Sequence, residues 1–157
     1  MGGDSLTYLI SIIIIILDQF SKSLAINHLK GNAPIVIIDG IFEFIYVENR
    51  GAAFGILQDR RIIFIIITLI VISFLIIYAY RNYSQLSTFA NVTLAMLIGG
   101  ATGNLIDRIR FGYVVDFIKV DLIRSYNFPV FNIADIFIVV STILLAYIIL
   151  FDKHEIE

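Results

Sequence analysis

Residues 130–151 read VFNIADIFIVVSTILLAYIILF, an apolar segment in which Asp135 is the only charged residue. A helix needs about 20 mainly apolar residues to cross the hydrocarbon core of a bilayer, and this segment has that length. Because lipid offers the backbone no hydrogen-bond partners, we expect a helix here despite the many β-branched Ile residues. A carboxylate in such a segment is costly, so Asp135 marks a candidate functional site.

Three further apolar segments are long enough to span a membrane, at about residues 6–25, 62–80 and 89–106. The chain has 157 residues, of which 59% are hydrophobic and 15% charged, whereas a soluble domain is nearer half apolar and a quarter charged. The sequence therefore predicts an all-α integral membrane protein, one domain over residues 1–157 with four transmembrane helices. The formal net charge of -2 argues against a nucleic-acid partner.

The linker after the first span contains a hairpin signal within residues 34–59. Residues 35–38 and 41–47 are rich in β-branched and aromatic side chains, and Asp39-Gly40 lies between them. This pattern predicts two strands joined by a two-residue turn. We expect a small sheet at the membrane surface that covers the site or holds a substrate, and an ordinary connector is the alternative.

The distribution of basic residues bears on orientation. Four spans place both termini on one side of the membrane. Lys and Arg residues are concentrated in the two long linkers on the opposite face, so the positive-inside rule would place those linkers in the cytoplasm.

A second carboxylate, Asp116, follows the third span in residues 114–117, while Asp135 opens the fourth span. The loop between them returns the chain to the same membrane face, so the two side chains can be neighbours. Two carboxylates that face each other share a proton, and one then acts as an acid and the other as a base. An acid and a base around one water suffice to hydrolyse an amide. Two independent carboxylates facing water are the alternative.

Polar residues within and near the spans predict a supporting network. Asp18 and Lys22 are four residues apart and share a helix face, which favours a structural ion pair. A role in gripping substrate or a lipid headgroup is the alternative. Asn132, one turn before Asp135, is placed to orient that carboxylate by hydrogen bonding.

Small residues in two segments predict close contacts of the backbone or between helices. Asn49 and Gly51 begin residues 49–55 (NRGAAFG), where small residues allow close backbone approach and Asn49 can bond a peptide. A surface turn explains this segment equally well. Gly99 and Gly103 form a small-xxx-small pair, which normally indicates tight helix packing.

Three polar residues lie within one turn at the end of the third span. We expect Asn104, Asp107 and Arg108 to form a hydrogen-bonded cluster that supports the site. The neighbouring Arg108 is expected to hold Asp107 ionised, which suits a structural anchor.

The absence of Cys and the scarcity of His restrict the catalytic mechanisms that the chain can use. The chain has no Cys and two His, His28 and His154, so thiolate catalysis is excluded and a His triad or zinc site is not expected. A small ion-coupled transporter that uses carboxylates as a relay would spread them across the membrane depth. Here they gather towards one face. A membrane scaffold without enzymatic activity would tolerate Asn at both aspartates.

Taken together, the polar motifs resemble those of the lipoprotein signal peptidase (signal peptidase II) family, the membrane aspartyl endopeptidases of bacteria. Any one motif is weak evidence, but five in order over most of a four-span chain are very specific. The motifs are residues 18–22 (DQFSK), 49–55 (NRGAAFG), 99–108 (GGATGNLIDR), 114–117 (VVDF) and 131–135 (FNIAD).

The resemblance implies four transmembrane helices with a small extracytoplasmic β-hairpin or sheet that cradles the substrate. It implies a prolipoprotein substrate whose lipobox Cys carries diacylglycerol, cleaved just before that Cys, and inhibition by globomycin. Metal and organic cofactor are not expected. Membrane lipid surrounds the protein, and nothing in the sequence requires more than a monomer. The family lies in the bacterial cytoplasmic membrane with its active site near the outer face, and we follow the family although the Lys and Arg count opposes this orientation.

The resemblance also assigns residues. Asp116 and Asp135 match the family's catalytic dyad. The other matching positions support the structure or line the substrate site in the family, and they are Asp18, Lys22, Asn49, Gly51, Asn104, Asp107, Arg108, Asn132 and Ala134.

Overall fold

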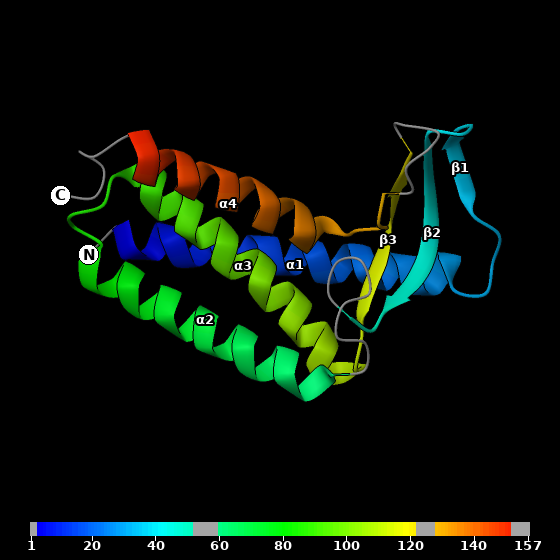
Figure 1. The fold of residues 1–157 in the computed structure, drawn as a ribbon, viewed down its shortest axis with the longest axis horizontal. Helices are drawn as coiled ribbons and strands as arrows, with labels where there is room; N and C mark the ends of the chain where they lie inside the picture. The colour runs from blue at the N-terminus through cyan, green and yellow to red at the C-terminus, as the bar shows by residue number, and fades with distance from the viewer. Residues whose placement is uncertain (1–2, 52–59, 122–127, 152–157) are drawn as a thin grey trace.

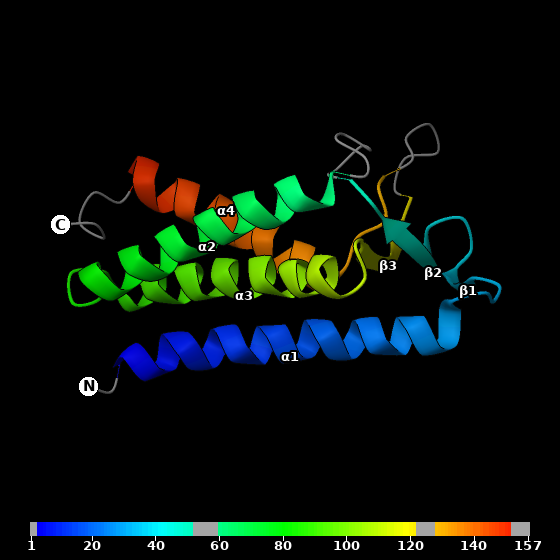
Figure 2. The ribbon, with the colours of Figure 1, turned by 90° about the horizontal axis from the view of Figure 1, so that it is seen from below.

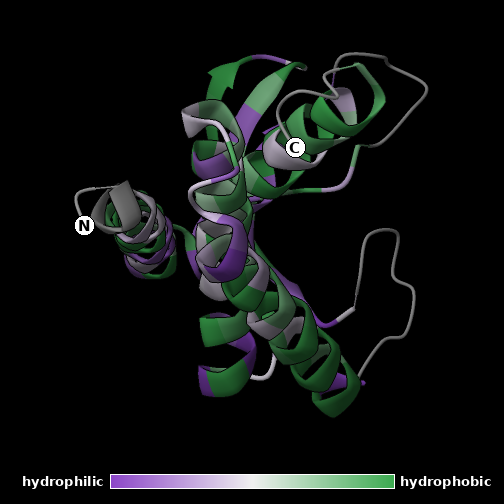
Figure 3. Cartoon of the chain, turned by 90° about the vertical axis from the view of Figure 1, so that its left-hand side faces the viewer, coloured by the Kyte–Doolittle hydropathy of each residue, from purple (hydrophilic) through white to green (hydrophobic). Residues whose placement is uncertain are grey.

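The computed structural model describes residues 3–51, 60–121 and 128–151 of the chain. Its four long helices are α1 (Gly3–Leu29), α2 (Arg61–Asn82), α3 (Thr88–Arg110) and α4 (Ile133–Phe151). All four are long and apolar enough to cross a membrane, and hydrophobic residues cover most of the helical ribbon (Figure 3). The start of α1 and the end of α4 lie at one end of the molecule, and a β-sheet lies at the other (Figures 1 and 2). The predicted fold class is confirmed.

Two helix boundaries differ from the prediction in ways that matter for the site. α3 continues to Arg110, so Asp107 and Arg108 lie on the helix rather than in a linker. α4 begins at Ile133, three residues later than predicted, because Phe131 forms a β-bridge with Ile118. The bridge holds the segment before α4 against the sheet.

The centre of the bundle is α3, which packs against the other three helices. In its most apolar window 61% of the residues are buried, compared with 11% in α2. Small and polar residues such as Asn91 and Thr93 lie inside the protein, whereas α2 presents bulky aliphatic side chains such as Ile66 and Ile70 outwards. This contrast explains why the most polar of the four spans is the one least exposed to lipid.

Glycines on α3 allow close approach of its neighbours, as the small-xxx-small pattern predicts. A Cβ atom at Gly99 would lie 3.0 Å from the Cβ of Ile14 on α1. A Cβ at Gly103 would lie 2.5 Å from a carboxylate oxygen of Asp18, also on α1. Close packing of α1 on α3 therefore depends on both glycines.

We expect Gly103→Ala to destabilise the protein by about 1–3 kcal/mol, because the added methyl group must displace the buried carboxylate of Asp18. Thermal unfolding in detergent, followed by far-UV circular dichroism, measures the effect. Gly99→Ala is the matched control and should cost less, since its nearest contacts need to move only by a few tenths of an ångström. Equal melting temperatures for Gly103→Ala and wild type would contradict this account of helix packing.

The sheet has three antiparallel strands, β1 (Ile35–Ile38), β2 (Phe42–Asn49) and β3 (Val114–Val120), in the order β1-β2-β3. The hairpin of β1 and β2 was predicted, but its connection has three residues, Asp39 to Ile41, instead of two. Gly40 adopts a positive φ of 69° in this turn, a conformation that favours glycine. The predicted two-residue turn is therefore wrong by one residue.

Strand β3 was not predicted, since its residues were assigned to a linker. The first four residues of its sequence VVDFIKV are all buried. Apolar and polar residues therefore do not alternate as they do in a half-exposed strand, and the period-two signal is missing. β3 pairs with β2 so that Asp116 lies opposite Val47 and Val114 lies opposite Asn49. The pairing brings Asn49 to the strand that carries Asp116.

The sheet rests on the end of α1. Val115 and Phe117 of β3 pack with Ala25 and Leu29 of α1 in one buried cluster. Since α1 also packs on α3, this contact fixes the sheet relative to the helices. Asp116 is thereby held at the junction of sheet and bundle.

Candidate active site

A buried ammonium group lies at the centre of the polar network. The Nζ of Lys22 is 2.9 Å from Oδ2 of Asp18, 3.1 Å from Oδ2 of Asp107 and 2.9 Å from Oδ1 of Asn104. Lys22 is only 2% exposed, and both aspartates are fully buried. The expected ion pair of Asp18 with Lys22 is present, and it includes a second carboxylate from α3.

This cluster also holds the start of α4. Oδ1 of Asp18 accepts a hydrogen bond of 3.0 Å from the backbone N–H of Ala134, one of the first N–H groups of that helix. A carboxylate is favoured at a helix N-terminus because of the helix dipole and the free N–H groups there. Asp18 thus fixes the position of α4 relative to α1.

The cation in contact with Asp107 is Lys22 rather than its sequence neighbour Arg108, which corrects the expected pairing. Asp107 also accepts hydrogen bonds from the side chain of Gln19 and from the backbone N–H of Val115, at 2.9 and 3.0 Å. The bond to Val115 ties α3 to the strand that carries Asp116.

Asp116 is 1% exposed and accepts hydrogen bonds from two asparagine side chains. Nδ2 of Asn49 lies 2.9 Å from its Oδ2, and Nδ2 of Asn132 lies 2.6 Å from its Oδ1. Asn49 thus contacts the carboxylate itself, and its Oδ1 accepts the backbone N–H of Gly51 at 3.1 Å. Ala52 to Gly55, the rest of this motif, lie outside the described residues.

Asp135 lies in the first turn of α4 and forms a reciprocal cap with Asn132. Its backbone N–H donates to Oδ1 of Asn132 at 2.9 Å, while its own Oδ2 accepts the N–H of Asn132 at 3.2 Å. Oδ1 of Asp135 accepts a bond of 2.7 Å from Nδ2 of Asn104. Asn132 therefore orients Asp135, as its spacing predicted, and holds Asp116 as well.

The two carboxylates interact electrostatically. Burial raises the pKa of Asp116 from its usual value near 4 to about 7, and the negative charge of Asp135 contributes to the rise. Two hydrogen-bond donors, Asn49 and Asn132, oppose the shift only in part. Near neutral pH Asp116 is therefore partly protonated, while both side chains line the same cavity.

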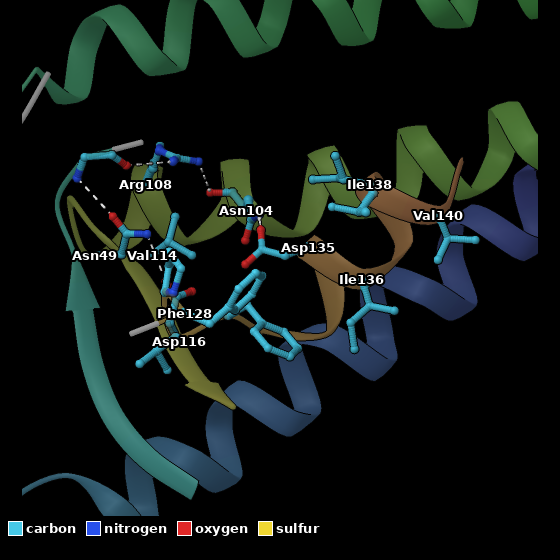
Figure 4. A pocket seen from close by; sticks show the side chains of 15 residues that line it. Asn49, Asn104, Arg108, Val114, Asp116, Phe128, Asp135, Ile136, Ile138 and Val140 are labelled. Carbon is cyan, nitrogen blue, oxygen red and sulfur yellow. Dashed lines mark hydrogen bonds between the residues drawn. The ribbon is translucent and has the colours of Figure 1, made fainter. Parts of the chain in front are cut away.

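The cavity has a volume of about 450 Å³. One end is polar, where Asn49, Asn104, Arg108, Asp116 and Asp135 meet (Figure 4). The rest of the wall is mainly apolar. It is formed by the segment before α4, with Phe128, Pro129, Val130 and Phe131, and by α4 itself, with Ile136, Ile138, Val139 and Val140. The cavity therefore combines a polar end with an apolar wall on the exposed side of α4.

Arg108 reaches the polar end of the cavity from α3. Its guanidinium lies 5.0 Å from the ring centre of Phe64 and makes long contacts with the carbonyl oxygens of Gly51 and Asn104, at 3.4 and 3.5 Å. It is half-buried and lines the cavity.

The structure therefore gathers every predicted site residue around one junction, with Ala134 fully buried beside Asp18. The residues that the sequence analysis missed are Gln19, which bonds both Asp18 and Asp107, and the apolar wall at 128–131. Gln19 is one of four polar residues in 18–22 within an apolar span, and this was an available signal. Within the described part of the chain, no three His, Asp or Glu side chains are grouped to hold a metal ion.

Comparisons with known proteins agree with this arrangement. A family model described as signal peptidase (SPase) II matches residues 10–151. The lipoprotein signal peptidase of Halothermothrix orenii is 47% identical over 140 residues, which cover 89% of this chain and 92% of that protein. The lipoprotein signal peptidase of Clostridioides difficile is 45% identical over 147 residues, covering 94% and 96% of the two chains.

Two solved structures share the fold, and both are described as bacterial membrane enzymes studied by the in meso method. The one at 2.3 Å resolution has a TM-score of 0.86 and covers 95% of this chain and 90% of its own. The one at 1.9 Å resolution has a TM-score of 0.83 and covers 95% of each chain. Each is 34% identical to this sequence.

Proposed function

Because the chain belongs to the signal peptidase II family, we propose that it removes the signal peptide from bacterial prolipoproteins by aspartyl catalysis. The proposed cleavage lies just before the lipobox Cys that carries diacylglycerol. The observation that carries the proposal is the pair of carboxylates, Asp116 and Asp135, on one cavity at the sheet end of the bundle. No nucleophilic side chain is required, which suits a chain without Cys.

The surroundings of the two carboxylates favour different roles. Asp116 is buried, and its raised pKa of about 7 favours the protonated acid. Asp135 is more exposed and lies at the N-terminus of α4, where the helix dipole and two N–H donors favour an anion. We assign Asp135 as the general base and Asp116 as the general acid.

In the first step Asp135 takes a proton from water as the water oxygen bonds to the scissile carbonyl carbon. The carbonyl π electrons move to its oxygen, which receives the proton of Asp116 and gives a neutral diol intermediate. In the second step Asp135 gives its proton to the amide nitrogen while the C–N bond breaks. Asp116 recovers a proton from a diol hydroxyl, so both carboxylates return to their starting states.

The cavity fits a substrate that is partly in lipid. The cavity of about 450 Å³ has room for a peptide segment and a water, and Arg108 at its polar end would offer N–H donors to a substrate carbonyl. The apolar wall along α4, from Ile136 to Val140, would contact acyl chains or the apolar part of the signal peptide. A site at the membrane edge leaves these apolar groups in lipid while the peptide meets water.

We place the protein in the bacterial cytoplasmic membrane with the sheet on the outer side. The basic residues at the sheet end oppose this orientation by number, but several are paired. Lys30 and Arg50 both contact Glu48, and Lys119 contacts Glu43 and Asp121, at 2.6–3.3 Å. Lys22 is buried within the bundle. Paired and buried cations weaken the argument from the positive-inside rule.

The proposal is tested with purified protein in detergent and a diacylglyceryl-modified prolipoprotein, with the cleaved bond located by mass spectrometry. We expect one cleavage, immediately before the modified Cys, and inhibition by globomycin at one molecule per protein monomer. The matched control is the same prolipoprotein without diacylglycerol, which should be cleaved far more slowly. If well-folded protein leaves the modified substrate intact, the proposal fails and ion flux in vesicles tests the transporter alternative.

A further inference from the structure

Two of the asparagines at the site are held by backbone groups. Oδ1 of Asn49 accepts the N–H of Gly51, and Oδ1 of Asn132 accepts the N–H of Asp135. With each oxygen occupied in this way, each side-chain nitrogen is directed to Asp116. The backbone therefore fixes which end of these two amides faces the carboxylate.

The third asparagine is held by side chains instead. Oδ1 of Asn104 lies 2.9 Å from the ammonium of Lys22 and accepts a longer bond of 3.2 Å from Nδ2 of Asn132. Nδ2 of Asn104 lies 2.7 Å from Oδ1 of Asp135. An ammonium group can only donate hydrogen bonds, so the amide atom that faces it must be the oxygen. The nitrogen of Asn104 must then face Asp135. Lys22 is thus in contact with the amide end that decides this orientation.

All three N–H groups of the Lys22 ammonium have acceptors within the protein. The ammonium has three N–H groups, and three acceptors, Asp18, Asp107 and Asn104, lie within 3.1 Å. The side chain is 2% exposed and does not line the cavity. These observations do not support a direct contact of Lys22 with substrate or with a lipid headgroup.

We propose that Lys22 is a positioning residue for catalysis, which locks the amide of Asn104 so that its N–H always donates to Asp135. The inference rests on the proposed function and assigns a role to a residue that never touches the substrate. Without Lys22 the oxygen of this amide keeps only the longer, uncharged bond of 3.2 Å from Nδ2 of Asn132, so the amide rotates more readily and presents its oxygen to the carboxylate. The ionised form of Asp135, which acts as base, then loses a donor and gains a repulsive neighbour.

Several charged groups surround Asp135. Asp116 on β3 and Arg108 on α3 share its cavity. Behind Asn104 lie Lys22 with Asp18 on α1 and Asp107 on α3. A test must therefore separate the loss of the donor from a change of charge.

The variants Asp107→Asn and Lys22→Met/Asp107→Asn achieve this separation. The double variant removes one positive and one negative charge, so the formal charge of the cluster stays as in wild type while the donor to Asn104 is lost. We expect its kcat to fall roughly 10- to 100-fold with little change in KM. We also expect the acid limb of its pH–rate profile to move to higher pH.

Asp107→Asn keeps the contact of Lys22 with Asn104 and removes a negative charge, so its acid limb should stay in place or move to lower pH. A double variant with wild-type kcat and an unmoved acid limb would overturn the proposal. If part of the double variant were only unfolded, its rate would fall but its acid limb would stay in place. That outcome would also overturn the proposal.

Asn104→Ala completes the test, because Lys22 is proposed to act through this residue. It should reproduce the defect of the double variant, and the triple variant should be no slower than Asn104→Ala alone. Losses that multiply in the triple variant would show that Lys22 acts independently of Asn104, and would overturn the proposal.

If the double variant does not fold, Asn104→Asp decides, since it keeps an acceptor for Lys22 but removes the donor to Asp135. Near-wild-type cleavage by Asn104→Asp would refute the proposal.

Failure of the proposed function is distinguishable from failure of this inference. If wild type does not cleave the lipid-modified prolipoprotein, the proposed function fails first. If wild type cleaves it and the variants behave otherwise than expected, only the role of Lys22 is lost.

Discussion

Asp116→Asn and Asp135→Asn should each lower kcat for prolipoprotein cleavage by about 10²–10⁴-fold or more, to the detection limit of a gel assay. Each amide keeps the size of the side chain but can neither accept a proton from water nor deliver one to the carbonyl oxygen. Both carboxylates line one cavity and are connected through Asn132, so neither can substitute for the other. Single-turnover rates with lipid-modified substrate measure the loss.

The folded state of both variants must be checked, because Asn49 and Asn132 both donate to Asp116 and an amide leaves one donor without an acceptor. Both variants should remain folded and bind globomycin, which cooperative thermal unfolding and inhibitor binding at the assay pH will check. Asp39→Asn, at an exposed carboxylate in the turn between β1 and β2, is the matched control and should cleave normally. Near-normal cleavage by either dyad variant would refute the catalytic assignment.

Much of this site was predictable because lipid restricts the backbone structures and the charged residues that a membrane-spanning segment can contain. Apolar segments of span length indicate helices with little ambiguity, and a charge near a span indicates a site. The pairing of Asp18 with Lys22 followed from helix periodicity, and the capping of Asp135 by Asn132 followed from their spacing. Each of these predictions concerns residues that are neighbours along the chain.

The unpredicted features depend on contacts between distant segments. Strand β3 forms because β2 offers it a partner, and its buried residues lack the alternation that marks a half-exposed strand. The partner of Asp107 is Lys22, far away in sequence, rather than the adjacent Arg108. The three asparagines could be recognised as polar residues, but the direction of each amide depends on its tertiary donor.

The raised pKa of Asp116 has a thermodynamic consequence for the whole protein. In the folded state this carboxyl keeps its proton up to about pH 7, because burial and the charge of Asp135 both disfavour its anion. In the unfolded chain the same group loses its proton near its usual pKa of 3.8. Between these two values the folded state binds more protons, so its stability falls as the pH rises. A shift of about three pKa units corresponds to at most ~4 kcal/mol.

We therefore expect the melting temperature of wild type in a non-ionic detergent to fall between pH 5 and pH 7.5, and to level off above that range. Asp116→Asn removes the titrating group and should abolish this slope, whatever its effect on absolute stability. Asp135→Asn removes only the repulsion, so the decrease should end at a lower pH and have a smaller total size, since burial of Asp116 remains. Asp39→Asn should keep the full slope. A wild-type slope that persists unchanged in Asp116→Asn would mean that another group causes it, and that Asp116 does not hold the proton which the proposed mechanism requires.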